Sequence, residues 1–104
     1  MKKLSSVEEY KELQNGEGVV FLFSAPWCKD CVFIEPQMPE IESSFPEFEF
    51  VYVNRDEYID LCIEEEIFGI PSFIMYKKGE VKGRFVSKDR KTKEEIEAFI
   101  ESCK

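Results

Sequence analysis

Residues 21–31 have the sequence FLFSAPWCKDC and join an apolar run to two cysteines. Residues 19–23 are continuously apolar, which is typical of a strand covered on both faces of a sheet. A helix is expected to begin near Cys28, and Pro36 and Pro39 should kink or interrupt it. The stretch therefore predicts a buried strand followed by a helix whose first turn carries both thiols.

The spacing of Cys28 and Cys31 suits thiol–disulfide chemistry. At the start of a helix this spacing brings the two sulfurs to one side, where they can form and break a disulfide. Unpaired backbone N–H groups and the helix dipole favour a thiolate on Cys28, and Lys29 adds to this while Asp30 opposes it. Because the thiolate is the attacking species, we expect Cys28 to be the nucleophile and Cys31 the resolving thiol.

A zinc knuckle is the main structural alternative for such a pair. It needs two further soft ligands at a matching spacing, but the chain has no His, and Cys62 and Cys103 stand singly. We therefore expect no metal and no cofactor. Cys62 is expected to fill the core as a small hydrophobe. Cys103 lies in a terminal helix that should fray, where its thiol could be exposed.

The rest of the chain alternates helices and strands. We expect a helix over residues 7–14, a strand over 48–53, a short helix over 58–66, a hairpin of strands 72–76 and 81–86, and a helix from about Thr92. Strands separated by helices imply right-handed parallel crossovers, and the hairpin adds an antiparallel edge. Residues 1–104 should form one α/β domain, with a central mixed β-sheet flanked by helices on both faces.

Charge and hydropathy exclude several partners. The net charge of −8 disfavours nucleic acid, so the basic cluster at Lys88, Arg90, Lys91 and Lys93 is expected to be a solvated loop. The longest apolar run is too short to span a membrane, and no secretory signal follows Met1. We expect a soluble, cytoplasmic monomer that binds neither membrane nor nucleic acid.

Taken together, these motifs resemble the thioredoxin family. Residues 21–31 look like its active-site strand and helix start, and Pro36 matches its helix-kinking proline. Residues 68–73, FGIPSF, match the segment that carries its cis-proline, and residues 76–81, YKKGEV, match the hairpin that follows. The motifs occur in the family's order and spacing along nearly the whole chain. The resemblance implies a thioredoxin-like fold and a protein-disulfide reductase that maintains thiol redox balance.

The resemblance also implies roles for residues around the cysteine pair. Pro71 would be cis and lie beside the pair, and the backbone of Ile70 would bind an extended substrate segment by strand addition. Trp27 would form an exposed apolar rim where substrates dock, rather than being a plain core aromatic. The implied substrates are disulfide-containing proteins or small molecules. The implied electron donor is a thioredoxin reductase or another dithiol.

The chain departs from the family pattern near the resolving thiol. Leu22 stands where the family has a buried Asp, and Tyr52 stands at about the position of the Lys that partners it. This removes an obvious general base for Cys31, for which water or Asp30 are the alternatives.

Two further departures concern the substrate. Ser87 replaces a glycine that keeps the docking surface open, and residues 27–36 are similar to a specialised branch that prefers small or selected disulfides. These departures leave a second hypothesis open, a redox-inactive binding module that docks a partner beside Pro71.

Overall fold

The strand that precedes the two cysteines lies at the centre of the sheet. In the computed structural model, which describes residues 1–104, β2 (Val19–Ser24) is parallel to β3 (Glu49–Asn54) and antiparallel to β4 (Ser72–Lys77). The short β1 (Lys2–Lys3) and β5 (Glu80–Phe85) form the edges, so the strand order is β1-β3-β2-β4-β5. Every residue of β2 is buried, as its continuous apolar sequence predicts.

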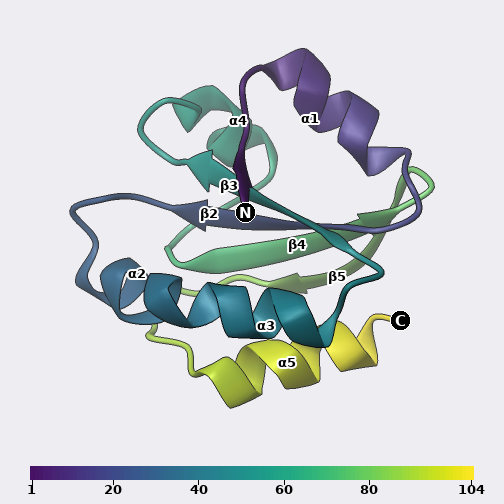
Figure 1. Cartoon of the computed structure of the whole chain (residues 1–104). Helices are drawn as coiled ribbons and strands as arrows, with labels where there is room; N and C mark the ends of the chain where they lie inside the picture. The colour runs from purple at the N-terminus through teal and green to yellow at the C-terminus, as the bar shows by residue number, and fades with distance from the viewer.

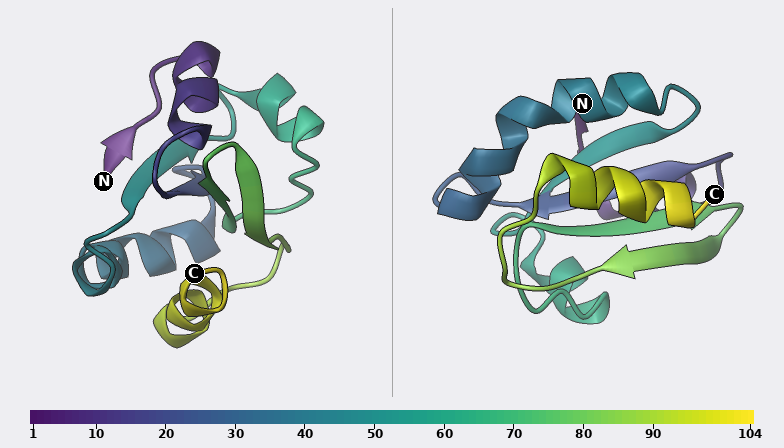
Figure 2. Two further views of the ribbon diagram at one scale, coloured as in Figure 1. Left: turned by 90° about the vertical axis from the view of Figure 1, so that its right-hand side faces the viewer. Right: turned by 90° about the horizontal axis from the view of Figure 1, so that it is seen from below.

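Helices cover both faces of this sheet. They are α1 (Val7–Gln14), α2 (Lys29–Ile34), α3 (Met38–Ser44), α4 (Ile59–Glu64) and α5 (Lys93–Ser102). Helices α1 and α4 lie on one face, and α3 and α5 lie on the other (Figures 1 and 2). The predicted mixed sheet between two helical layers is confirmed. No helix has the length and apolar character needed to cross a membrane.

The side chains of β2 alternate between two cores. Phe21 belongs to the core under α1 and α4, where its ring centroid lies 4.3 Å from that of Tyr10. Leu22 belongs to the opposite core, together with Ile34 and Ile96. The alternation follows from the two-residue period of a strand. It makes β2 a fixed platform for the site at its carboxyl end.

A 3-10 turn interrupts the helix after the cysteines, as predicted. Residues Glu35–Gln37 form this turn, with Pro36 inside it, between α2 and α3. Pro39 lies in the first turn of α3, where its missing N–H needs no partner. The interruption divides the predicted helix into two short helices and places Glu35 in the turn between them.

Several helix and strand boundaries differ by one or two residues from the prediction. Helix α4 ends at Glu64, and Glu66 adopts a positive φ of 56° that a continuing helix does not allow. Strand β5 begins at Glu80. Helix α5 begins after Thr92, whose side chain forms a capping box with Glu95.

The two remaining cysteines are both buried. Cys62 is 3% exposed, which confirms its predicted place in the core. The expectation that the Cys103 thiol could be exposed is wrong, because it is only 8% exposed. Cys103 packs against Gly83 of β5, where a Cβ atom would collide with its Sγ. The missing side chain at Gly83 makes the space that Cys103 fills.

Candidate active site

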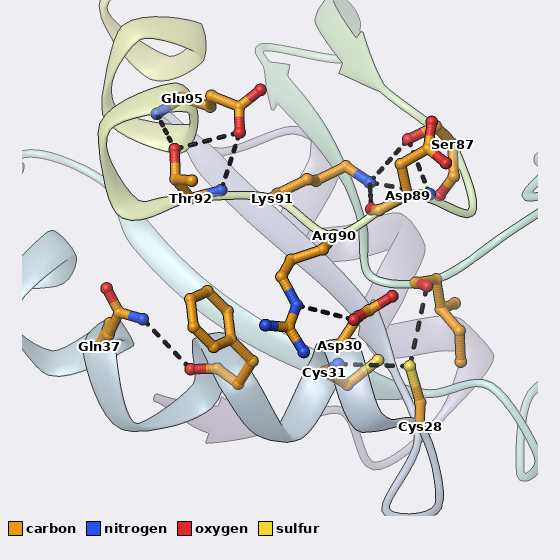
Figure 3. A network of polar contacts seen from close by, with 12 residues as sticks. Cys28, Asp30, Cys31, Gln37, Ser87, Asp89, Arg90, Lys91, Thr92 and Glu95 are labelled. Carbon is orange, nitrogen blue, oxygen red and sulfur yellow. Dashed lines mark hydrogen bonds and ion pairs between the residues drawn. The ribbon is translucent and has the colours of Figure 1, made fainter.

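The two thiols lie at the N-terminal end of α2. Cys28 is the N-cap residue, and its Sγ accepts a hydrogen bond from the backbone N–H of Cys31 at 3.3 Å. The Cys28 thiol in turn donates to the carbonyl oxygen of Ile70 at 3.7 Å (Figure 3). Both thiols are free, but Cys28 is 8% exposed and Cys31 is 0% exposed. Of the two, only Cys28 presents surface to an incoming disulfide.

Cys31 lies in surroundings that keep it protonated. Burial raises the pKa of its thiol to about 12, and a hydrogen bond with Cys28 acts in the same direction. The Ser24 hydroxyl and the backbone of Ala25 oppose this rise by hydrogen bonding. Because only a thiolate attacks a disulfide, Cys31 must lose its proton before it can react.

The segment around Pro71 closes the site on the other side. The Ile70–Pro71 peptide bond is cis, which confirms the expectation drawn from the family resemblance. The Ile70 carbonyl contacts Cys28, so this segment lies directly beside the pair. Ser72 donates a hydrogen bond to the carbonyl oxygen of Ser87 at 3.3 Å. This bond joins the Pro71 segment to the loop that precedes α5.

Trp27 lies at the surface next to Cys28. Its side chain is 61% exposed, so the alternative that it is a core aromatic is wrong. The indole N–H donates to the Asp56 carboxylate at 2.7 Å, and the Arg55 guanidinium lies 5.6 Å from the ring centroid. Phe68 is also exposed, at 84%. Two large, exposed apolar side chains, Trp27 and Phe68, are thus close in sequence to Cys28 and to Ile70, which contact each other.

The burial of Lys91 contradicts the expectation that the whole basic cluster is solvated. It is 1% exposed, and its ammonium donates to the carbonyl oxygen of Ser87, the hydroxyl of Ser87 and the carbonyl oxygen of Asp89, at 3.2, 2.9 and 3.0 Å (Figure 3). Burial lowers the pKa of this lysine. All three of its protons are used inside the loop, which explains how the charge is accommodated.

Arg90 also has a specific place beside the site. Its Nε donates to Asp30 Oδ1 at 2.8 Å, and its guanidinium lies 4.2 Å from the ring centroid of Phe33 (Figure 3). The Asp30 carboxylate, one sequence-based alternative for the missing base, is therefore engaged in a charged hydrogen bond. A count of charges does not reveal this pairing, because the two residues are sixty positions apart in the chain.

Ser24 and Glu35 are two further polar residues of the site that no sequence motif indicated. Ser24 is fully buried at the end of β2, and its hydroxyl donates to Glu35 Oε2 at 3.3 Å. Tyr52 of β3 lies beside them, where burial raises the pKa of its phenol and the Ser24 hydroxyl opposes the rise. The available signal was that Ser24 is the single polar residue of an otherwise apolar strand. No cluster of three or more metal-ligating side chains is present.

A dithiol at a helix start, beside a cis-proline and at the end of a central strand, defines a thiol–disulfide oxidoreductase. The family model described as Thioredoxin matches residues 2–102. Rabbit (Oryctolagus cuniculus) thioredoxin is 32% identical over 103 residues, covering 96% of this chain and 95% of the rabbit protein. The chain belongs to the thioredoxin family.

Further relatives agree with this assignment. The yeast (Saccharomyces cerevisiae) protein thioredoxin-3, mitochondrial, is 28% identical, covering 81% of this chain and 67% of its own. The solution structure of oxidised Plasmodium falciparum thioredoxin has a TM-score of 0.83 and 25% identity, covering 97% of this chain and 95% of its own. The protein is a thiol–disulfide oxidoreductase of the protein-disulfide reductase type, and the hypothesis of a redox-inactive binding module is not favoured.

Proposed function

We propose that Cys28 attacks the substrate disulfide and that Cys31 resolves the mixed disulfide. The difference in exposure between the two thiols carries this assignment, because an incoming sulfur can meet Cys28 but not the fully buried Cys31. The Cys31 N–H that points at Cys28 Sγ supports it further, since a donor to sulfur stabilises the thiolate.

The proposed reaction runs in two exchange steps. The Cys28 thiolate attacks one sulfur of the substrate disulfide, that S–S bond breaks, and one substrate thiolate leaves. Cys31 then loses its proton and attacks Cys28 Sγ. The mixed disulfide breaks, the second substrate thiolate leaves, and a Cys28–Cys31 disulfide remains. Two electrons have passed to the substrate, and an external dithiol, a thioredoxin reductase or a similar donor, restores the pair.

Trp27, Ile70 and Pro71 form the proposed substrate-binding surface. The exposed indole of Trp27 offers an apolar edge next to Cys28. The carbonyl oxygen of Ile70 already contacts Cys28, so a strand added along this segment would bring its own cysteine to the nucleophile. The surface suits disulfides in extended protein segments and small-molecule disulfides.

The cytoplasm is the proposed compartment. Cys62 and Cys103 are buried in opposite cores and so cannot form a structural disulfide with each other, which suits a reducing environment. A relative that is named mitochondrial makes the mitochondrion the alternative, and localisation of the tagged full chain in its own cells separates the two.

Reduction of insulin in the presence of dithiothreitol tests the proposed roles. The wild-type chain should accelerate insulin precipitation, and Cys28→Ser should reduce the rate to that of dithiothreitol alone. Cys62→Ser is the matched control, because the buried Cys62 forms no hydrogen bond with Cys28 or Cys31, and it should retain activity. Equal rates for the wild type and Cys28→Ser would show that Cys28 is not the nucleophile.

A further inference from the structure

Cys31 needs a route by which its proton can leave. The thiol is fully buried, and burial favours the protonated form. Leu22, which stands where the family has a carboxylate, is 1% exposed and packs in the apolar core. Asp30 is engaged with Arg90. Neither Leu22 nor an unpaired Asp30 is therefore available to take the proton.

The Ser24 hydroxyl is bonded to a carboxylate and acts on the Cys31 thiol. Ser24 donates its proton to Glu35 Oε2 at 3.3 Å, which leaves its oxygen lone pairs free to accept a hydrogen bond. The Ser24 hydroxyl also acts on the Cys31 thiol and on the Tyr52 phenol, since it lowers the pKa of both groups against the effect of burial. The direction of the Ser24–Glu35 bond is the one that a proton moving from Cys31 towards Glu35 requires.

Glu35 connects this buried chain to solvent. Its side chain is half-buried, and it lines a cavity of about 400 Å³ together with Tyr52, Asn54 and Glu57. The 3-10 turn at Pro36 sets Glu35 in this position, between the end of β2 and the cavity. A proton that reaches Glu35 can therefore pass to water without crossing either apolar core.

We propose that Glu35, acting through the Ser24 hydroxyl, accepts the Cys31 proton in the resolving step. This proposal rests on the resolving role proposed for Cys31. It replaces the carboxylate missing at Leu22 with one that comes from the turn after α2.

The proposed transfer is balanced. Cys31 gives its proton to Ser24 Oγ while Ser24 gives its own proton to Glu35 Oε2, so Ser24 ends as it began. The Cys31 thiolate attacks Cys28 Sγ, the new S–S bond forms, and the bond to the substrate sulfur breaks. The substrate leaves as a thiolate, and Glu35 later releases its proton to water in the cavity.

Other titratable groups face this unit from several elements. Tyr52 comes from β3, and Glu57 lies after β3 on the cavity. Lys3 of β1 and Glu42 of α3 line the same cavity. Lys91 approaches Cys31 from the loop before α5, and its positive charge interacts with that thiol, but its three protons are held by the loop. Cys28 adjoins Cys31 within the site. Glu35 is the carboxylate among these elements that bonds Ser24.

The test measures the two exchange steps separately in the full chain. Mixed-disulfide formation on Cys28 is followed in the Cys31→Ser background, and its decay is followed in the chain with Cys31 intact, by rapid acid quench and mass spectrometry. Glu35→Gln should slow the decay about 100-fold at pH 7 and leave the formation rate unchanged, because only the resolving step needs the carboxylate. Glu35→Asp, which keeps the charge, should recover part of the rate.

The pH profile separates a proton acceptor from a structural group. The wild-type decay rate should depend only weakly on pH between about pH 6 and 8, because the proton acceptor is then a group of the protein and not hydroxide. In Glu35→Gln it should rise about tenfold per pH unit, because hydroxide must then remove the proton. Ser24→Ala should behave like Glu35→Gln, and the double variant should be no slower than either single one, because both act in one chain.

Glu57→Gln is the matched control, since it lines the same cavity without bonding Ser24. Its decay rate should equal that of the wild type. Normal mixed-disulfide formation with an unchanged decay rate and pH profile in Glu35→Gln and Ser24→Ala would overturn the proposed relay alone. Absence of any mixed disulfide on Cys28 in the Cys31→Ser chain would overturn the proposed function, and the relay with it.

Discussion

Gly69 lies two residues before Pro71, where the chain passes against the loop that carries Lys88. A Cβ atom at position 69 would stand 2.5 Å from both the backbone N and the Cα of Lys88. Backbone atoms cannot move aside as the end of a flexible side chain can. We therefore expect Gly69→Ala to push the Pro71 segment away from the loop before α5.

The size of this effect follows from the contact. Carbon atoms pack at about 3.5–4.0 Å, so the two segments must separate by about 1 Å. Overpacking of this kind costs about 1–3 kcal/mol of unfolding free energy, which corresponds to roughly 4–8 °C in melting temperature per kcal/mol. The hydrogen bond from Ser72 to the Ser87 carbonyl spans the same gap at 3.3 Å and should weaken with it. The Ile70 carbonyl, which contacts Cys28, should shift as well.

Urea unfolding followed by circular dichroism measures the loss of stability, and insulin reduction measures the loss of activity. Gly16→Ala is the matched control, because a Cβ there meets only the Leu13 carbonyl oxygen, at 3.4 Å. Its stability should stay within about 0.5 kcal/mol of the wild type. The reasoning is refuted if Gly69→Ala is as stable and as active as Gly16→Ala.

Three further predictions concern other parts of the molecule. Burial raises the pKa of the Cys62 thiol from its ordinary value of 9.0 to about 11. The unfolded state therefore loses that proton first, and stability falls as pH rises between these values. Urea titrations at several pH values measure how the unfolding free energy decreases with pH. Cys62→Ala should make this decrease smaller by up to about 1.4 kcal/mol per pH unit, and an unchanged pH dependence would contradict the prediction. Thr92→Ala removes the capping box of α5 and should lower the unfolding free energy by about 1 kcal/mol, and an unaltered urea midpoint would argue against the cap. Trp27→Ala should leave stability within about 0.5 kcal/mol, because the side chain is largely exposed, but lower kcat/KM for insulin roughly tenfold; an unchanged kcat/KM would exclude the docking rim.

The features that the sequence predicted well are those with a local cause. The apolar run of β2, the cysteine spacing after it and the proline that interrupts the next helix each follow from residues close together in the chain. The cis peptide at Pro71 was expected only through the family resemblance, since proline alone makes cis a minority state.

The features that were missed depend on contacts between distant segments. Lys91 was expected in solvent because lysines seldom lose water, but the fold of its own loop supplies three acceptors. Cys103 is buried because a glycine on β5 leaves room for it. The Ser24–Glu35 bond joins the end of a strand to a turn eleven residues later, and only the tertiary path between them brings the two groups together.

The most direct test of the account is to identify which thiol carries the substrate. Cys28→Ser and Cys31→Ser are compared in a chain whose buried Cys62 and Cys103 are both replaced by alanine, and each is mixed with a peptide disulfide and analysed by mass spectrometry. We expect a stable peptide adduct on Cys28 in Cys31→Ser and no adduct at a comparable rate in Cys28→Ser. An adduct that forms faster on Cys31 than on Cys28 would contradict it.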